Sequence, residues 1–210
     1  MTTTQLGRPV GASGEQTRAR IINAVMRCVA EMGYSKATIR SIASAAGMTS
    51  ASLYNYFPNR SALMKAAIAA RADIALPRLH QAAQRSGGAI DRIEAVLDES
   101  GKLMHEYPDL AAFEWAIRAE GASLTPADSA EVQFLELHQI IEGIVDDGFR
   151  RGELAKGADA RAAVEVLYAL LYGLTELAAS ASPSIYHATL EASKRLIRGM
   201  LFEREAQPPR

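Results

Sequence analysis

Cysteine is almost absent from this sequence, and its scarcity excludes a disulfide-stabilised fold. The single cysteine, Cys28, has no partner for an internal disulfide, so we expect a reducing, cytoplasmic environment. Cys28 stands in an apolar helical pattern with Ile21, Val25 and Val29. Such a position favours a buried core thiol over a redox sensor.

Long uncharged apolar runs are also missing. A transmembrane helix needs about 18 or more such residues, and the best candidate, 162–175, is shorter and contains Glu165. The N-terminus lacks the basic and then apolar pattern of a secretory signal peptide. We therefore expect a soluble protein without a membrane partner.

The motifs of common enzymes are absent. The sequence has no phosphate-binding glycine loop, paired-histidine zinc motif, CxxC pair or nucleophile elbow. His138 and Glu142 have the spacing of two metal ligands on one helix face, but without a second histidine nearby an intrahelical pair or a polar pocket contact is favoured. His80, His105 and His187 have no partners at ligand spacing. We predict no catalysis, no metal and no cofactor.

Alternating β-branched strands are missing too, whereas apolar residues recur at helical spacing throughout. We predict an all-α protein of about nine helices, with a three-helix N-terminal head and a helical body. Pro77 should kink or end the fourth helix. The expected helices cover about 15–32, 38–47, 49–57, 60–85, 90–106, 108–120, 126–151, the segment after Asp159, and 185–202.

The chain divides into four expected regions. Residues 1–14 should form a disordered arm, 15–58 the three-helix head, 59–205 the helical body, and 206–210 a mobile tail. Arg8 in the arm lies in a Gly-Arg-Pro sequence that resembles a minor-groove arm, although a flexible tail without DNA contacts remains the simpler alternative.

Residues 38–60 have the pattern of a helix-turn-helix. Thr38 is a suitable N-cap for the first helix, Gly47 can end it in the left-handed conformation, and Thr49 can cap a second, short helix. A small residue, Ala43, stands where the two helices cross. This geometry is typical of DNA-reading motifs, although an ordinary corner between two helices remains an alternative at this level.

Acidic residues are scarce in the first third of the chain. Residues 1–71 hold nine Lys or Arg and two acids, a net charge of +7, and the remainder carries −8. The positive charge coincides with the helix-turn-helix pattern. We therefore expect an electropositive, nucleic-acid-binding module on an acidic body.

The segment from about Arg18 to Leu63 resembles the DNA-binding domain of the TetR family of bacterial transcriptional regulators. The matching positions are Arg20-Ile21-Ile22, Gly33-Tyr34, Ala37-Thr38, Ile42-Ala43, Ala46-Gly47 and the run from Leu53 to Arg60, with Leu63. The family usually has Lys where this chain has Arg60, and both cations can contact phosphate.

The resemblance implies two sets of DNA-binding residues. Arg40 and the exposed face of the second helix are the expected base readers, to which Asn55, the hydroxyls of the 49–52 segment and the Ala51 methyl group are suited. Thr38, Tyr54, Tyr56 and Arg60 are the expected phosphate anchors, and the hydroxyls of the 49–52 segment can serve phosphate as well as bases. Core packing is an even alternative for Tyr54. The complete expected interface is Thr38, Arg40, Thr49, Ser50, Ala51, Ser52, Tyr54, Asn55, Tyr56 and Arg60.

The resemblance also places an effector pocket in the body and makes the 60–85 helix the link between effector and head. Aromatic and sulfur side chains gather where such a pocket is expected, although plain core packing is the alternative for each of them. The pocket candidates are Met104, Tyr107, Phe113, Trp115, Phe134 and His138.

The segment after Asp159 is apolar around almost its whole circumference, so every side of that helix must be covered. A second copy of the same surface is the expected partner, and the last helix would complete an intersubunit four-helix bundle. The predicted dimer contacts are Val166, Ala169, Leu170, Gly173, Leu174, Leu177, Leu196 and Met200.

Two functional classes remain. A ligand-responsive regulator needs both operator specificity and a pocket, whereas a constitutive or architectural DNA binder needs only the basic head. We expect the first, namely a repressor that binds a near-palindromic double-stranded operator as a homodimer and is released by a small, mainly apolar effector.

Overall fold

The computed structural model describes residues 10–119 and 131–199, and only the backbone in 10–13, 118–119 and 131–135. All regular elements within these ranges are helices, in agreement with the predicted all-α fold. They are α1 (Val10–Met32), α2 (Ile39–Ala45), α3 (Ser50–Tyr54), α4 (Arg60–Ala83), α5 (Ala89–Glu106), α6 (Pro108–Ala119), α7 (Glu131–Arg150), α8 (Ala160–Ser180) and α9 (Pro183–Ile197).

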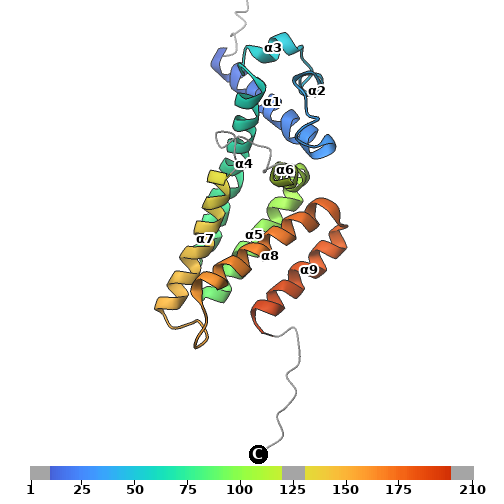
Figure 1. Cartoon of the computed structure of the whole chain (residues 1–210). Coiled ribbons are helices and arrows are strands. Elements are labelled where there is room, and N and C mark those ends of the chain that lie inside the picture. Colours follow the sequence, from blue (N-terminus) through green and yellow to red (C-terminus); the bar gives the residue numbers. More distant parts are fainter. Residues whose placement is uncertain (1–9, 120–130, 200–210) are drawn as a thin grey trace, which may run out of the picture.

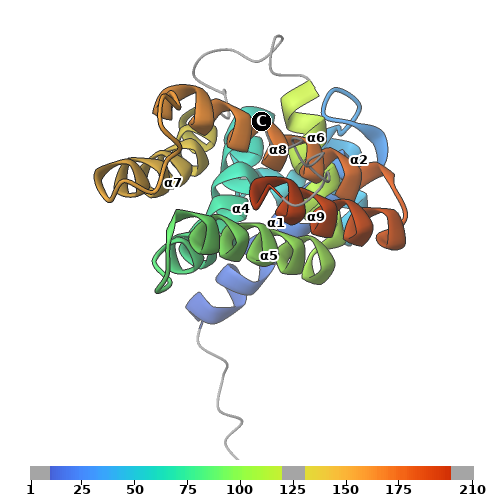
Figure 2. The same cartoon turned by 90° about the horizontal axis from the view of Figure 1, so that it is seen from below.

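The helices form a head and a body that share two elements. Helices α1, α2 and α3 make the head, and α4 runs from the head into the body of α5, α7, α8 and α9 (Figure 1). Helix α6 contacts both α1 and α8, and so lies between head and body. Seen from below, α5 and α9 lie side by side (Figure 2).

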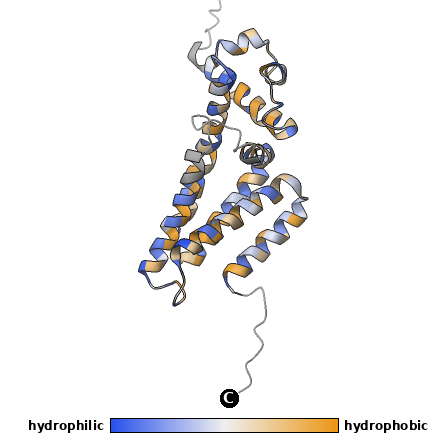
Figure 3. Ribbon diagram, viewed as in Figure 1, coloured by the Kyte–Doolittle hydropathy of each residue, from blue (hydrophilic) through white to orange (hydrophobic). Residues whose placement is uncertain are grey.

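Two hydrophobic cores hold these parts together. The head core is built from α1, α2, α3 and the start of α4, and it also includes Phe113 and Ile117 of α6. The hydrophobic stretch of α1 lies next to α6 at this junction (Figure 3). Cys28 is part of this core, and burial raises the pKa of its thiol, as expected for an unreactive core cysteine. The second core joins α4, α5, α7, α8 and α9.

Most predicted helix boundaries agree with the structure, but α3 ends at Tyr54 rather than at 57 and α9 ends at Ile197 rather than at 202. Three further features are of note. Helix α1 begins at Val10, so 10–14 belong to a helix rather than to the expected disordered arm. Helix α4 continues through Pro77 to Ala83, so of the two expected effects of this proline the end of the helix does not occur. Asp73, whose carbonyl loses its helical donor at Pro77, is exposed, and water can replace that donor. Helix α9 begins at Pro183, two residues early, because Ser182 caps it. Arg8, Met200 and the 206–210 tail lie outside the described residues.

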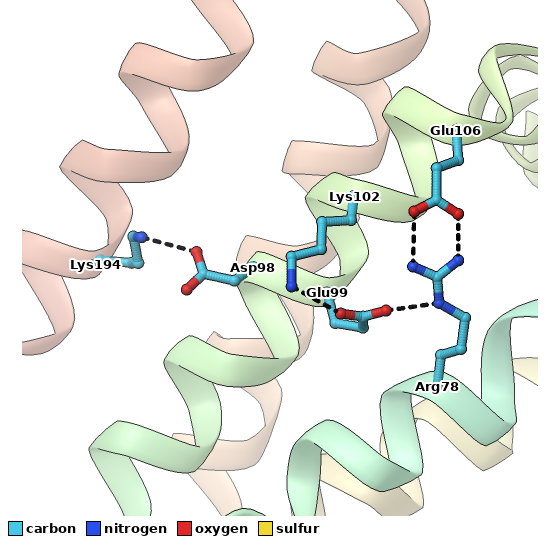
Figure 4. A network of polar contacts seen from close by, with 6 residues as sticks. All are labelled: Arg78, Asp98, Glu99, Lys102, Glu106 and Lys194. Carbon is cyan, nitrogen blue, oxygen red and sulfur yellow. Dashed lines mark hydrogen bonds and ion pairs between the residues drawn. The ribbon is translucent and has the colours of Figure 1, made fainter.

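An ion-pair network fixes α5 between α4 and α9 (Figure 4). Arg78 of α4 contacts Glu99 at 2.6 Å and Glu106 at 2.5 Å, and Lys194 of α9 contacts Asp98 at 2.8 Å. The hydrogen bond from Arg78 lowers the pKa of the Glu106 carboxyl below its ordinary value. The body is thus stabilised by surface charge as well as by its core.

Candidate nucleic-acid interface and effector site

Helix α2 is fixed at both ends by the residues that the sequence pattern singled out. The Thr38 hydroxyl accepts a hydrogen bond from the backbone N–H of Ser41 at 3.1 Å, and the Ser41 hydroxyl oxygen accepts one from the Thr38 N–H at 3.0 Å, a capping box. At the other end, the N–H of Met48 donates to the carbonyl of Ala43 at 3.0 Å, and Gly47 has φ +66°. This is a Schellman turn, in which a side chain at Gly47 would be strained.

The turn delivers the chain directly to α3. The Thr49 hydroxyl accepts from the backbone N–H of Ser52 at 3.1 Å and so caps α3, and it lies 2.9 Å from the Ser52 hydroxyl. Leu53 and Phe57 are buried beneath α3. Short helices held at a fixed angle in this way are the geometry needed to place α3 in a major groove.

The structure distinguishes the buried residues of this motif from the exposed ones. Leu53 and Phe57 occupy the core, whereas Tyr54 is 50% exposed, so the alternative of core packing for Tyr54 is wrong. None of the predicted interface residues is buried: Thr38, Arg40, Thr49, Ala51, Tyr54 and Asn55 are exposed, and Ser50, Ser52, Tyr56 and Arg60 are half-buried.

Three arginines brace the head by donating hydrogen bonds to its backbone carbonyls. Arg18 donates to the carbonyl of Tyr56 at 3.3 Å and stands 4.2 Å from the centre of the Phe57 ring. Arg27 donates to the carbonyl of Ala45, at the end of α2, at 3.0 Å. Sequence reasoning missed both contacts, because they join segments that are far apart in sequence.

Arg60 is the third brace. Its Nε donates to the carbonyl of Ala37 at 3.0 Å, its Nη2 donates to the carbonyl of Tyr34, and its guanidinium lies 4.5 Å from the centre of the Tyr34 ring. These contacts tie the start of α4 to the connection between α1 and α2. Arg60 was predicted as a phosphate anchor, and the structure shows it holding the head together.

The expected pocket residues whose side chains are described do not line one shared cavity. Tyr107 is 42% exposed, and Phe113 is fully buried in the head core. Trp115 faces Tyr172, with ring centres 5.9 Å apart. Of the set, Met104 lines cavities, while the Phe134 side chain is not described.

His138 is occupied by a contact across helices rather than by Glu142. Its Nε2 lies 3.1 Å from an oxygen of Glu165, and its ring packs edge-on against Tyr168. In the part of the chain that the structure describes, no three His, Cys, Asp or Glu side chains are close enough to hold a metal ion.

A small cavity of about 30 Å³ lies inside the body, among α4, α5, α6, α7 and α8. Its polar wall contains an ion pair that sequence reasoning missed: Arg71 of α4 and Glu114 of α6, 2.7 Å apart and each 7% exposed. The remaining lining is apolar except for the hydroxyls of two residues, and it comprises Ala75, Leu76, Leu79, Ser100, Leu103, Met104, Leu137, Leu171 and Thr175. Arg71, counted with the head by sequence, is therefore neutralised inside the molecule.

A wider cleft of about 650 Å³ opens on the face of α8 and α9. Val166, Ala169, Leu170 and Leu196, four of the predicted dimer contacts, line it, and Val166 is 68% exposed. Gly173 and Leu177 are partly exposed. Among the described helices, α8 alone is long and apolar enough to cross a membrane, by length and composition only.

Leu174 is an exception among the predicted dimer contacts. It is 4% exposed and belongs to the body core together with Val164 and Leu171. These three buried residues recur at helical spacing and define the side of α8 that faces the chain's own interior, so a partner can contact only the opposite side.

Known proteins resemble this chain in its head and over most of its length. Residues 21–67 match the model of the family described as bacterial regulatory proteins, tetR family. The fatty acid metabolism regulator protein of Bacillus subtilis is 24% identical over 71% of this chain and 76% of its own. The regulator UidR of Escherichia coli K12 is 24% identical over 76% of this chain and 80% of its own. These relatives are transcriptional regulators and not enzymes, in agreement with the sequence prediction.

Solved structures share the fold over nearly the whole chain. FadR from Bacillus subtilis, crystallised with stearoyl-CoA, superposes with a TM-score of 0.69 at 19% identity, covering 86% of this chain and 98% of that one. GusR from Salmonella enterica gives a TM-score of 0.69 at 24% identity, covering 93% and 98%.

Proposed function

We propose that this chain, which belongs to the TetR family of bacterial transcriptional regulators, is a cytoplasmic repressor that binds a near-palindromic operator as a homodimer. The observation that carries the proposal is the α2–α3 unit. Both of its helices are capped, its turn is closed by Gly47, and its outer face presents Arg40, Tyr54 and Asn55 on a head rich in basic residues. Arginine and asparagine suit guanine and adenine edges, and the hydroxyls suit phosphate.

Two features support the proposed dimer, namely the short recognition helix and the exposed apolar face of α8. One short recognition helix contacts only a few base pairs, so specificity needs two heads about 34–36 Å apart on successive major grooves. The exposed apolar face around Val166 and Leu170 is a surface that a soluble monomer does not favour. A second copy would cover this face, and the 650 Å³ cleft with it, through an α8–α9 bundle.

A small effector with a mainly apolar body is the proposed signal. The position of α6 supports this proposal, because its Glu114 lines the inner cavity and its Phe113 and Ile117 lie in the head core. A ligand that displaces α6 would therefore also disturb the head, and a coupling of about 1 to 3 kcal/mol would change operator affinity roughly 5- to 150-fold. The stearoyl-CoA in Bacillus subtilis FadR indicates that this fold can hold an acyl ligand.

The small volume of the inner cavity favours one competing function, a constitutive DNA binder. Pockets for small ligands usually measure about 300–1,000 Å³, and this cavity measures about 30 Å³. Under the regulator hypothesis, the cavity expands when the effector binds. A constitutive binder would have no such expanded state.

Selection of bound sequences from random DNA duplexes tests the proposed function. We expect an enriched, near-palindromic site, bound by two chains per duplex. Arg40→Ala and Asn55→Ala should each weaken binding to that site by about 1 to 3 kcal/mol, with much smaller losses on random DNA. Failure to enrich any sequence, or equal losses on both kinds of DNA, would contradict the assignment of base readers.

A further inference from the structure

The buried ion pair between Arg71 and Glu114 is the most unusual feature of the body. Both side chains are more than nine-tenths buried, and their charged ends meet at the wall of an otherwise mostly apolar cavity. Replacing such a pair by apolar residues is often neutral or stabilising, so its presence needs a reason other than stability.

We propose that this pair is the polar subsite of the effector site, and that the effector is an amphipathic molecule with a carboxylate head and an apolar chain. The carboxylate takes the place of Glu114 on Arg71, and the chain extends along the leucine and methionine side chains of the cavity. This inference rests on the proposed function and specifies the chemical class of its ligand.

The sign of the ligand charge follows from the chemistry of the two residues. An arginine cannot lose its proton in a protein, so a buried Arg71 needs an anion in every state. A glutamic acid can become neutral by taking up a proton when it loses its partner. Among the described residues, Arg71 and Glu114 are the titratable ones that line the cavity. An anionic ligand on Arg71 therefore replaces the charge of Glu114, whereas a cationic ligand on Glu114 would compete with an arginine that keeps its charge in every state.

The size of the cavity explains how such a ligand would act. The present volume of about 30 Å³ holds roughly one water molecule, so an alkyl chain fits only after the surrounding helices separate. A ligand that fits only the expanded state shifts the population toward it. Because Glu114 is next to Phe113 in α6, and Phe113 is fully buried in the head core, the expanded state displaces a part of the head core.

A tryptophan next to Glu114 can report the movement of α6. Trp115 is the single tryptophan of the sequence, directly follows Glu114 and packs on Tyr172 of α8. Its intrinsic fluorescence should change when α6 moves. The full-length protein can therefore be titrated without a label.

The test compares decanoate, decanol and decylamine, which share a ten-carbon chain and differ in the charge of the head. Each is titrated into the wild type with Trp115 fluorescence as the readout. We expect decanoate to bind about tenfold or more tightly than the other two, since hydrogen bonds to charged groups contribute on this scale. Equal binding of the three compounds, or stronger binding of decylamine, would overturn the inference.

Variants of the two halves of the pair should respond in opposite directions. Glu114→Gln removes the competing carboxylate while keeping its shape, so decanoate should bind tighter than to the wild type. Arg71→Met should lose the preference for decanoate over decanol. The double variant Arg71→Met with Glu114→Leu, which leaves no buried charge and should fold, should show the same loss. A pair with only a structural role would weaken decanoate binding alike in both single variants, and that result would refute the inference.

Operator binding separates this inference from the proposed function. Decanoate should lower the affinity of the wild type for its selected operator and leave that of the double variant unchanged. If an operator is selected but decanoate does not alter its binding, this inference fails and the regulator remains. If no operator is selected, the proposed function fails even where decanoate binds.

Discussion

Replacement of Arg60 separates two roles that one side chain can have, bracing the head and contacting phosphate. The guanidinium of Arg60 bonds two carbonyls, those of Tyr34 and Ala37, and covers the Tyr34 ring. Lysine, which the resemblance suggests as the usual residue here, has the charge but not the planar fork. Arg60→Ala and Arg60→Lys are therefore the informative pair.

The expected magnitude follows from these contacts. Hydrogen bonds to a charged group contribute about 1.5 to 3 kcal/mol when buried, and an exposed cation–π contact about 0.5 to 1 kcal/mol. Arg60 is half-buried, so water can replace part of what is lost. We expect Arg60→Ala to lower the free energy of unfolding by about 2 to 3 kcal/mol, and Arg60→Lys by about 1 to 2 kcal/mol, since one ammonium cannot serve both carbonyls in the same geometry.

Urea unfolding followed by circular dichroism measures this loss, and the salt dependence of DNA binding measures the phosphate role. The matched control is Arg40→Ala, which removes an exposed arginine of the same head and should change stability by less than about 0.5 kcal/mol. Arg60→Lys should keep the salt slope of the wild type. An Arg60→Ala variant of unchanged stability that binds DNA more weakly would refute the bracing role.

Three further predictions concern the dimer, the readout and acid stability. Val166→Arg should give a folded monomer by sedimentation, because Val166 is 68% exposed, whereas Leu174→Arg should unfold the chain, because Leu174 is 4% exposed; a dimeric Val166 variant would contradict the interface. Arg40→Ala should weaken operator binding measured by fluorescence anisotropy, whereas Arg85→Ala, an exposed arginine of the body, should not. The pKa of Glu106 is lowered below its ordinary 4.5, so its ion pair stabilises the fold above that pH and the contribution is lost as the pH falls through the lower folded-state pKa. Glu106→Gln should thus show less loss of stability on acidification, and an acid-unfolding midpoint that does not move would count against this pair.

The local signals of the sequence were sufficient to predict the helix caps and the turn of the helix-turn-helix. Thr38, Thr49 and Asn59 each cap a helix as their residue type predicts, and Gly47 takes a positive φ. Caps and turns depend on residues only a few positions apart, so their chemistry can be recognised without knowing the fold. Pro77 shows the limit of this rule, because an exposed proline can remain inside a long helix.

The packing of the body could not be predicted from such local signals. Phe113 was assigned to a pocket by its size and aromatic character, but it packs in the head core because α6 crosses beside α1. Arg71 and Glu114 stand 43 residues apart, and nothing in their local sequence indicates that they meet. Long-range pairing of this kind depends on how helices cross, which periodicity alone does not define.

The placement of Phe113 and Ile117 has a consequence for engineering. Chimaeric regulators are commonly imagined as a DNA-reading module joined to a sensor module at a linker, and the expected boundary at residue 58 invites such a cut. In this chain a head removed there would lose the apolar side chains that α6 supplies, and would expose the side of α1 that they cover. A transplanted head would need the matching α6 surface from its donor, so the smallest exchangeable unit of this protein is discontinuous in sequence.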